Sequence, residues 1–269
     1  MRSLLTYETK NADQLKTQLR DDYVNTRSFA DRLRREFDYV WKKIDVHPFL
    51  VELENGKLPI SKYKTYALQN YFYLIEEHRS ASAAIARAHT SADVLLLRKW
   101  GKYFEPEFER YVGIMRAVGI TEEELERVTM DPRIPLPAAR AYVDFTYKTY
   151  CTGTMGELAA CLLPCAWSYS IREVGGLGCA PRIAKGLGDH YGVDREVAFA
   201  YGNYASEKPN FLELISLKET ISKETQEGSD ELAVRIREIF RRCSEYEYIW
   251  WDLAYKHDPN KERELGSFF

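Results

Sequence analysis

The chain has 269 residues, 45% of them hydrophobic and 29% charged, and its 38 basic residues nearly balance 41 acidic ones, for a formal net charge of −3. This composition provides no broad basic field, so nucleic acid and anionic membrane surfaces are not expected as partners. The apolar cluster in the first residues is too short for a signal peptide or a membrane span. The five cysteines lack paired metal-ligand spacing. We therefore expect a cytoplasmic protein whose thiols are reduced.

The N-terminal part of the chain divides into an extension and a first helix. Residues 1–26 are polar and weakly patterned, and we interpret them as an extension to a single domain over residues 27–269. Within residues 29–44, apolar side chains recur every three or four positions, which predicts a helix. Thr26 or Ser28 could cap its N-terminus.

A break and a long helix follow. His47-Pro48-Phe49 ends the first helix, and residues 54–59 are typical of a turn. We expect His47 to be a structural residue at a helix end, with Phe49 packed in the core. The pattern then predicts a long helix over residues 62–88, capped by Ser61.

The remaining helices differ in the strength of their signals. Thr121 and Glu124 have the spacing of a capping box, and Pro106 is expected to bend or break the helix that begins near Ser91. No segment shows the period-two alternation of strands bounded by hairpin turns, so the sequence predicts an all-α bundle. The other predicted helices lie at residues 108–119, 121–125, 138–150, 153–172, 211–224 and 230–256, whereas residues 181–206 give no clear pattern.

The segment 153–172 combines a mostly apolar composition with unusual polar groups. Glu157, Cys161, Cys165 and Tyr169 follow one another at intervals of four residues, so on a helix they form one oblique ridge. Pro164 removes a backbone donor beside Cys165 and is expected to kink or loosen the helix there. Because free cysteine also packs as a small hydrophobe, a role in the core is the alternative for both thiols.

Two further clusters combine rings with polar groups. Glu247 lies among tyrosines and tryptophans in residues 243–255, and Tyr66, Asn70 and Tyr73 share one helical face. Phenols and an amide can hold a flat heterocycle by stacking and by hydrogen bonds to its edge. Packing against neighbouring helices is the alternative interpretation of both clusters.

The sequence gives little support for metal chemistry. Neither an HxxxH nor an ExxH pattern occurs, and the adjacent residues Glu76, Glu77 and His78 point in different directions on a helix. An iron-dependent oxygenase would need several histidines and carboxylates facing inward, and the five histidines are scattered. We therefore expect neither a metal nor a cofactor.

Three segments together resemble the TenA, or thiaminase II, family in order and spacing, and the resemblance extends from about Phe29 to Tyr255. These segments are HPFLVELENGKLPISKYKTYALQNYFYL, ELAACLLPCAWSY and EYEYIWWDLAY. The resemblance implies an all-helical, heme-oxygenase-like bundle that binds no heme and commonly forms a homotetramer. It also implies a hydrolase that acts on a small-molecule pyrimidine, either thiamine or aminopyrimidine fragments of degraded thiamine, for salvage.

Carried over residue by residue, the resemblance implies a catalytic thiol at Cys165 and a catalytic carboxylate at Glu247. Asn70 stands where the family usually has an aspartate that binds the ring nitrogen and amino group of the pyrimidine, and an amide brings no charge to that position. The alternative function is therefore a non-catalytic pyrimidine-binding or regulatory protein that retained the pocket. The aromatic pocket positions implied by the resemblance are Tyr73, Tyr142, Tyr169, Tyr204 and Trp250.

Overall fold

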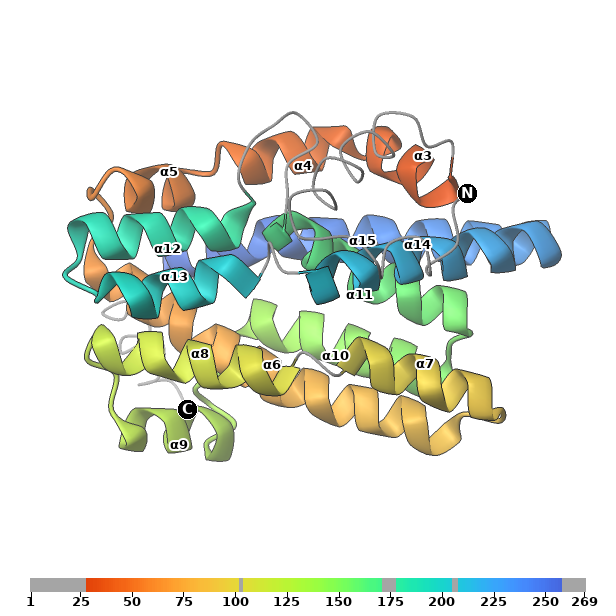
Figure 1. Ribbon diagram of the computed structural model, residues 1–269, viewed down its shortest axis with the longest axis horizontal. Coiled ribbons are helices and arrows are strands. Elements are labelled where there is room, and N and C mark those ends of the chain that lie inside the picture. Colours follow the sequence, from red (N-terminus) through yellow and green to blue (C-terminus); the bar gives the residue numbers. More distant parts are fainter. Residues whose placement is uncertain (1–27, 102–103, 171–177, 205–207, 258–269) are drawn as a thin grey trace, which may run out of the picture.

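The computed structural model describes residues 28–101, 104–170, 178–204 and 208–257, and within these ranges every regular element is a helix (Figure 1). The predicted all-α class is confirmed, and the predicted extension over residues 1–26 lies outside the described residues. The helices are α3 (Phe29–Glu36), α4 (Asp38–Asp45), α5 (Pro48–Glu54), α6 (Ile60–Arg87), α7 (Ser91–Gly101), α8 (Phe104–Ala117), α9 (Glu122–Met130), α10 (Pro137–Thr152), α11 (Met155–Ser170), α12 (Cys179–His190), α13 (Arg195–Tyr204), α14 (Lys208–Glu227) and α15 (Asp230–Lys256).

Four long helices enclose the centre of the bundle. α11 packs against α14 and α15, α6 packs against α10, and α15 contacts both α6 and α10. In Figure 1, α3, α4 and α5 lie along the upper edge and α6 to α10 lie below, with α11, α14 and α15 between them. The interior faces of α6, α10, α11 and α15 therefore meet around one shared core.

Side-chain caps fix several helix ends that the sequence predicts. Ser28 accepts a hydrogen bond from the backbone N–H of Asp31 at the start of α3, and Thr121 with Glu124 forms the predicted capping box of α9. Such caps satisfy backbone donors that would otherwise lack partners in the first turn, and each typically contributes about 1 kcal/mol. The predicted Ser61 cap is wrong, because α6 begins at Ile60 directly after Pro59 and includes Ser61 in its first turn.

Residues 29–54 hold three helices, where one was predicted over residues 29–44. The helix predicted over residues 29–44 divides at Phe37, which has non-helical torsion angles and stacks on Phe240. His47 then caps α5 by accepting a hydrogen bond from the N–H of Phe49 at 3.1 Å, and Pro48 occupies the first helical position, which a proline tolerates. The structural role predicted for His47 and the burial of Phe49 are both confirmed.

Other differences concern short helices. The break predicted at Pro106 falls earlier, since α7 ends at Gly101 and Pro106 lies in the first turn of α8, where a missing N–H removes no helical hydrogen bond. Residues 181–206, which gave no clear pattern, contain most of α12 and all of α13. Gly192 has a φ of +70° between them, and Asp194 accepts a hydrogen bond from the N–H of Glu196 at 2.8 Å.

Candidate active site

Four helices bring a thiol, a carboxyl group and two phenols together in the centre of the bundle. Tyr142 of α10 donates a hydrogen bond of 2.8 Å to Oε1 of Glu247 on α15. The hydroxyl of Ser168 lies 3.3 Å from Oε2 of the same carboxyl, and the thiol of Cys165 on α11 is its third hydrogen-bonding neighbour. The structure thus places Cys165 and Glu247 in direct interaction, although they come from distant parts of the sequence.

The environment of Glu247 favours its protonated form. The side chain is buried, and this burial raises the pKa of its carboxyl group from 4.5 to about 7, while the hydrogen bonds from Tyr142, Ser168 and Cys165 limit the rise. A carboxyl with a pKa near neutrality can both accept and donate a proton at physiological pH. Glu247 is therefore suited to exchange a proton with the Cys165 thiol beside it.

Aromatic rings form the wall around these polar groups. The ring centroid of Tyr73 lies 5.3 Å from that of Tyr142 and 5.5 Å from that of Trp250. Tyr246, which the sequence analysis did not assign to the site, stacks on Tyr142 with centroids 4.8 Å apart. These contacts fix the Tyr142 ring from both sides, so its hydroxyl is held in place against Glu247.

A second group of rings adjoins the thiol. Tyr169 lies one turn after Cys165 on α11 and interacts electrostatically with both Cys165 and Glu247. Its hydroxyl forms a 2.9 Å hydrogen bond with the hydroxyl of Tyr66, and both rings stack on the fully buried Trp251. Tyr169 is thus anchored from α6 and α15 at once.

Comparison with known proteins assigns this arrangement to a family. Residues 34–257 match the model of the TENA/THI-4/PQQC family. The chain belongs to this family. It is 28% identical over 237 residues to the aminopyrimidine aminohydrolase of Bacillus subtilis, a match that covers 86% of this chain and 91% of that protein.

Solved structures agree with the TENA/THI-4/PQQC assignment. A TenA homologue protein from P. horikoshii OT3 superimposes with a TM-score of 0.66 at 27% identity, covering 85% of this chain and 99% of that one. A domain with a heme oxygenase-like fold from Shewanella denitrificans superimposes with a TM-score of 0.63 at 14% identity, covering 88% and 94%. The predicted heme-oxygenase-like fold is confirmed.

The TenA resemblance implies two further site residues, at positions 70 and 204. Asn70 lies on α6 between Tyr66 and Tyr73, on the face that these two rings define. Its side chain is buried. Tyr204 is the last residue of α13, and its side chain lies outside the described part of the structure.

The predicted ridge on α11 separates into different roles. Glu157 accepts hydrogen bonds of 2.7 Å from Arg235 and from the backbone N–H of Thr154, so it holds the N-terminus of its own helix. Cys161 packs against Cys243 of α15 with the two sulfurs 3.6 Å apart. Only the second half of the ridge, Cys165 and Tyr169, therefore reaches Glu247.

The cluster has two levels along the same four helices. We call the level formed by Tyr73, Tyr142, Cys165 and Glu247 the reactive layer. Glu77, Cys161 and Cys243 lie one turn away from it on α6, α11 and α15, and Tyr150 lies two turns away on α10. We call these four residues the dry layer because all four are at most 3% exposed. The sequence analysis missed Ser168 and the burial of Glu77, although Ser168 follows Cys165 at the i, i+3 spacing of a shared helical face.

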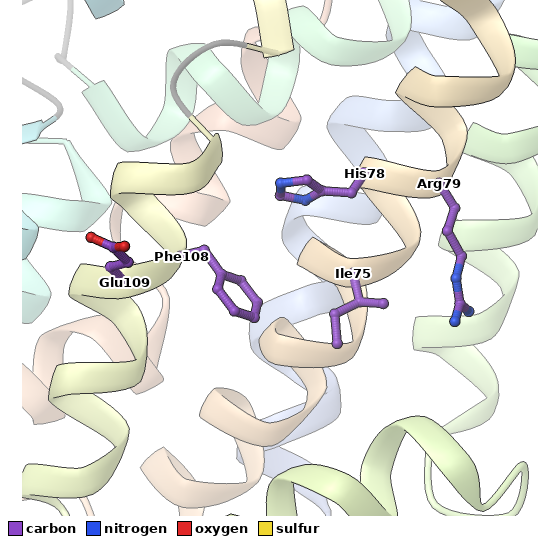
Figure 2. A pocket seen from close by; sticks show the side chains of 5 residues that line it. All are labelled: Ile75, His78, Arg79, Phe108 and Glu109. Atoms are coloured by element: carbon purple, nitrogen blue, oxygen red, sulfur yellow. The ribbon is translucent and has the colours of Figure 1, made fainter. Parts of the chain in front are cut away.

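The outer face of α6 borders a separate hollow of about 440 Å³. Figure 2 shows Ile75 and His78 of α6 facing Phe108 of α8 across it, with Arg79 and Glu109 at its rim. His78 is oriented by a 2.8 Å hydrogen bond between its Nδ1 and the carbonyl of Leu74. This hollow lies on a different face of α6 from Tyr73 and is not part of the reactive layer.

No group of three or more histidine, cysteine, aspartate or glutamate side chains in the described ranges could hold a metal ion. Within the same ranges, no helix has the length and apolar character needed to cross a bilayer.

Proposed function

We propose that the protein is an aminopyrimidine aminohydrolase of thiamine salvage, which converts an aminopyrimidine to its hydroxymethyl counterpart and releases ammonia. The observation that carries this proposal is the contact of the Cys165 thiol with a buried, proton-accepting Glu247 inside a wall of rings. The similarity to a Bacillus subtilis protein named aminopyrimidine aminohydrolase supports the choice of substrate class.

In the first half of the reaction, Cys165 adds to the pyrimidine ring. Glu247 takes the thiol proton, and the resulting thiolate forms a bond with a ring carbon. Glu247 then delivers that proton to a ring nitrogen, so the ring does not accumulate negative charge. Loss of aromaticity lets the ring expel the exocyclic amine, which is bound in its ammonium form and leaves as neutral ammonia when its bond to the methylene carbon breaks.

In the second half, water replaces the amine. A water molecule adds to the exocyclic methylene carbon, with Glu247 accepting one of its protons. The bond between the ring carbon and the Cys165 sulfur then breaks, the ring nitrogen gives its proton back to the sulfur, and the ring regains its aromaticity. Glu247 passes the proton that it took from water to the departing ammonia. The sum is one water consumed and one ammonium ion released, with Cys165 again a thiol and Glu247 again a carboxylate.

The remaining residues bind and orient the ring. Tyr142 and Ser168 hold the Glu247 carboxyl from two sides, so its free lone pairs stay directed at the thiol and the substrate. Tyr73 and Trp250 provide apolar surface on which a flat heterocycle stacks, and they exclude water from the reacting atoms. Asn70 accepts from the amino group of the pyrimidine and donates to a ring nitrogen.

Ammonia release from an aminopyrimidine tests the proposed activity. Purified protein should release ammonia in proportion to hydroxymethyl product, and Cys165→Ser should bind the same pyrimidine by calorimetry without releasing ammonia. The matched control is Cys161→Ser, whose thiol contacts Cys243 in the dry layer and which should keep turnover. Binding without ammonia release by the wild type would instead support a non-catalytic pyrimidine-binding protein, for which the neutral Asn70 is the motivating feature.

We also infer a cytoplasmic homotetramer. The five cysteines are present as thiols and not as disulfides, although the sulfurs of Cys161 and Cys243 lie only 3.6 Å apart, which suits a reducing compartment. Large apolar side chains such as Leu95, Met130 and Phe199 are more than half exposed, and subunit contacts would cover surface of this kind. Light scattering coupled to size exclusion should give four times the 31.3 kDa mass of the chain, and a monomeric mass would contradict the inference.

A further inference from the structure

Two thiols in the dry layer lie in contact, although the proposed mechanism uses neither. The sulfurs of Cys161 on α11 and Cys243 on α15 are 3.6 Å apart, and both side chains are buried. Two sulfurs in a disulfide lie about 2.05 Å apart, so closing this gap requires a movement of about 1.5 Å. The pair is therefore a dithiol that oxidation can convert to a disulfide with little rearrangement.

This dithiol adjoins the reactive layer on both of its helices. Cys161 precedes Cys165 by about one turn of α11, and Cys243 precedes Glu247 by about one turn of α15. The contact of Cys161 with Cys243 and that of Cys165 with Glu247 therefore join the same two helices at successive turns. An oxidised sulfur at position 165 would have a thiol one turn away on its own helix.

The surroundings of the three thiols determine which of them reacts first with an oxidant. Cys165 is half-buried and lies beside Glu247, a carboxyl group that can take its proton. Burial and the hydrogen bond with Cys161 raise the pKa of the Cys243 thiol. Because the thiolate is the form that attacks a peroxide, each unit of increase in pKa lowers the reactive fraction about tenfold. A peroxide therefore reacts at Cys165 before it reacts at the dithiol.

Pro164 loosens the turn of α11 that separates Cys165 from Cys161. It lies inside the helix and lacks the N–H that would bond to the carbonyl of Ala160. Side chains four residues apart on a helix have their Cβ atoms about 5–6 Å apart, and a disulfide brings two such atoms to about 4 Å. The turn that must tighten for Cys161 to reach Cys165 is thus held by one hydrogen bond fewer than a regular turn.

We propose that Cys161 and Cys243 form a resolving dithiol, which returns Cys165 to its thiol form after a peroxide has oxidised it and stores the oxidation as a buried disulfide. In the first step, Glu247 takes the proton of Cys165, and the thiolate attacks one oxygen of the peroxide. With hydrogen peroxide, Cys165 becomes a sulfenic acid. The hydroxide ion that leaves takes the proton from Glu247 and becomes water.

Two further steps transfer the oxidation to the dry layer. The Cys161 sulfur attacks the sulfur of the sulfenic acid, and the hydroxyl group leaves as water with the proton of Cys161. Cys243 then attacks the Cys161 sulfur, and the Cys165 sulfur leaves and gains the proton that Cys243 loses. The sum is two thiols and one hydrogen peroxide converted to one disulfide and two water molecules. Because no pyrimidine takes part, the inference does not depend on the proposed hydrolysis.

Hydrogen peroxide followed by alkylation and peptide mass spectrometry tests these steps. The reduced wild type, treated with a stoichiometric amount of peroxide, should yield peptides joined by a Cys161–Cys243 disulfide, with Cys165 alkylated as a thiol. Cys165→Ser should form this disulfide at least about tenfold more slowly, because the two thiols that remain there are buried. Cys243→Ser should instead accumulate a disulfide between Cys161 and Cys165. In Cys161→Ser, excess peroxide should convert Cys165 to sulfinic acid.

Cys151→Ser is the matched control, because Cys151 is half-buried like Cys165 but lies on α10 beside Tyr147. It should leave the products and their rates unchanged. A Cys161–Cys243 disulfide that forms equally fast in Cys165→Ser would overturn the inference. Sulfinic acid at Cys165 of the wild type in place of this disulfide would overturn it as well, and that measurement requires no substitution, so it stands even where a variant does not fold.

Reduction provides a second measurement of the same steps. Dithiothreitol added after excess peroxide should return all three thiols of the wild type, counted by alkylation. In Cys161→Ser, Cys165 should stay oxidised, because a thiol reductant does not reduce a sulfinic acid. Equal loss of the Cys165 thiol in the wild type and in Cys161→Ser after reduction would show that the dithiol gives no protection, and the inference would be wrong.

Discussion

The reactive layer and the dry layer are built from the same four helices and nearly the same side chains, yet their hydrogen bonding differs. Glu247 in the reactive layer has hydrogen bonds from Tyr142, Ser168 and Cys165, whereas the Glu77 carboxyl in the dry layer interacts with the hydroxyl of Tyr150. The thiols differ in the same way, since Cys165 is half-buried beside an acid and Cys161 packs against Cys243.

A buried carboxyl group near a cysteine is therefore not sufficient for the proposed thiol–carboxyl pair. Burial raises the pKa of both Glu247 and Glu77 to about 7, so the two acids have similar proton affinities. Of the two acids, Glu247 is the one that combines that affinity with a half-buried thiol beside it. We therefore expect the reactive layer to govern turnover and the dry layer to govern stability.

The thiols provide the largest expected contrast. Cys165→Ser should lower kcat by about 10⁴-fold or more, because a serine hydroxyl remains protonated where the mechanism needs a thiolate. Cys161→Ser should leave kcat within about threefold while lowering the free energy of unfolding by about 1–3 kcal/mol, because it places a hydroxyl in a dry site. Steady-state kinetics with denaturant unfolding measures both effects, and equal kinetic losses in the two variants would contradict the distinction between the layers.

The two carboxyl groups give the next contrast. Glu247→Gln should lower kcat by about 10²- to 10⁴-fold, the usual contribution of general acid–base catalysis. The amide can neither take the thiol proton nor return it to the ring, so the remaining activity should also lose its titration near neutral pH. Glu76→Gln, on the surface of α6, should leave both the rate and its pH profile unchanged. If Glu247→Gln kept the wild-type pH profile, a residue other than Glu247 would be responsible for the pH dependence.

Adjacent residues on α6 show where prediction from sequence stops. Glu76, Glu77 and His78 are predicted to point in different directions, and the structure agrees, with Glu76 on Arg79, Glu77 in the dry layer and His78 in the outer hollow of Figure 2. Helical periodicity predicts that the three side chains point in different directions. Which of them points into the core depends on how α6 is rotated about its axis against α10 and α15. That rotation is set by tertiary packing and not by local sequence.

For helix ends and for site residues alike, the features that local sequence signals determine are the ones that can be predicted. Strong periodicity and capping signals predict the start of α9 and both ends of α15, because these signals act within one or two turns. The predicted end of α9 is wrong, since the helix predicted through Leu125 continues to Met130. The same signals fail for α12 and α13, two short helices joined by the turn at Gly192. The motifs assign Cys165 and Glu247, whereas the placement of Ser168 on the Glu247 carboxyl depends on the contact between α11 and α15.

The dry layer should limit stability in a pH-dependent way. A carboxyl whose folded-state pKa is raised from 4.5 to about 7 holds its proton in the folded state where the unfolded chain has lost it. Its contribution is therefore fully present below pH 4.5 and is lost as the pH rises through about 7, by up to about 3 kcal/mol. Both Glu77 and Glu247 act in this direction, so the free energy of unfolding of the wild type should fall across this window.

Glu77→Leu measures how much of this fall in the free energy of unfolding is due to Glu77. At pH 8 the variant should unfold with a free energy about 1–3 kcal/mol above the wild type, because it removes a buried acid that is ionised at this pH. At pH 4.5 the difference should shrink, since the wild-type acid is then neutral. Denaturant unfolding at the two pH values measures this, and an unchanged stability at pH 8 would show that the interaction with Tyr150 offsets the burial of the carboxylate.

The smallest expected effect comes from removing the hydrogen bond that Tyr142 donates to Glu247. Tyr142→Phe removes the donor to Oε1 of Glu247, whose hydrogen bond lowers the pKa of that carboxyl, so the pKa should rise above about 7. The reaction begins with Glu247 ionised, and the acidic limb of the kcat/KM profile should therefore move to higher pH, with a loss of about tenfold at neutral pH from one hydrogen bond. Phenylalanine keeps the ring that stacks on Tyr246, so KM should change little. A shift of the acidic limb to lower pH would mean that Tyr142 stabilises the protonated form of Glu247, and the carboxyl would then act first as the acid and not as the base.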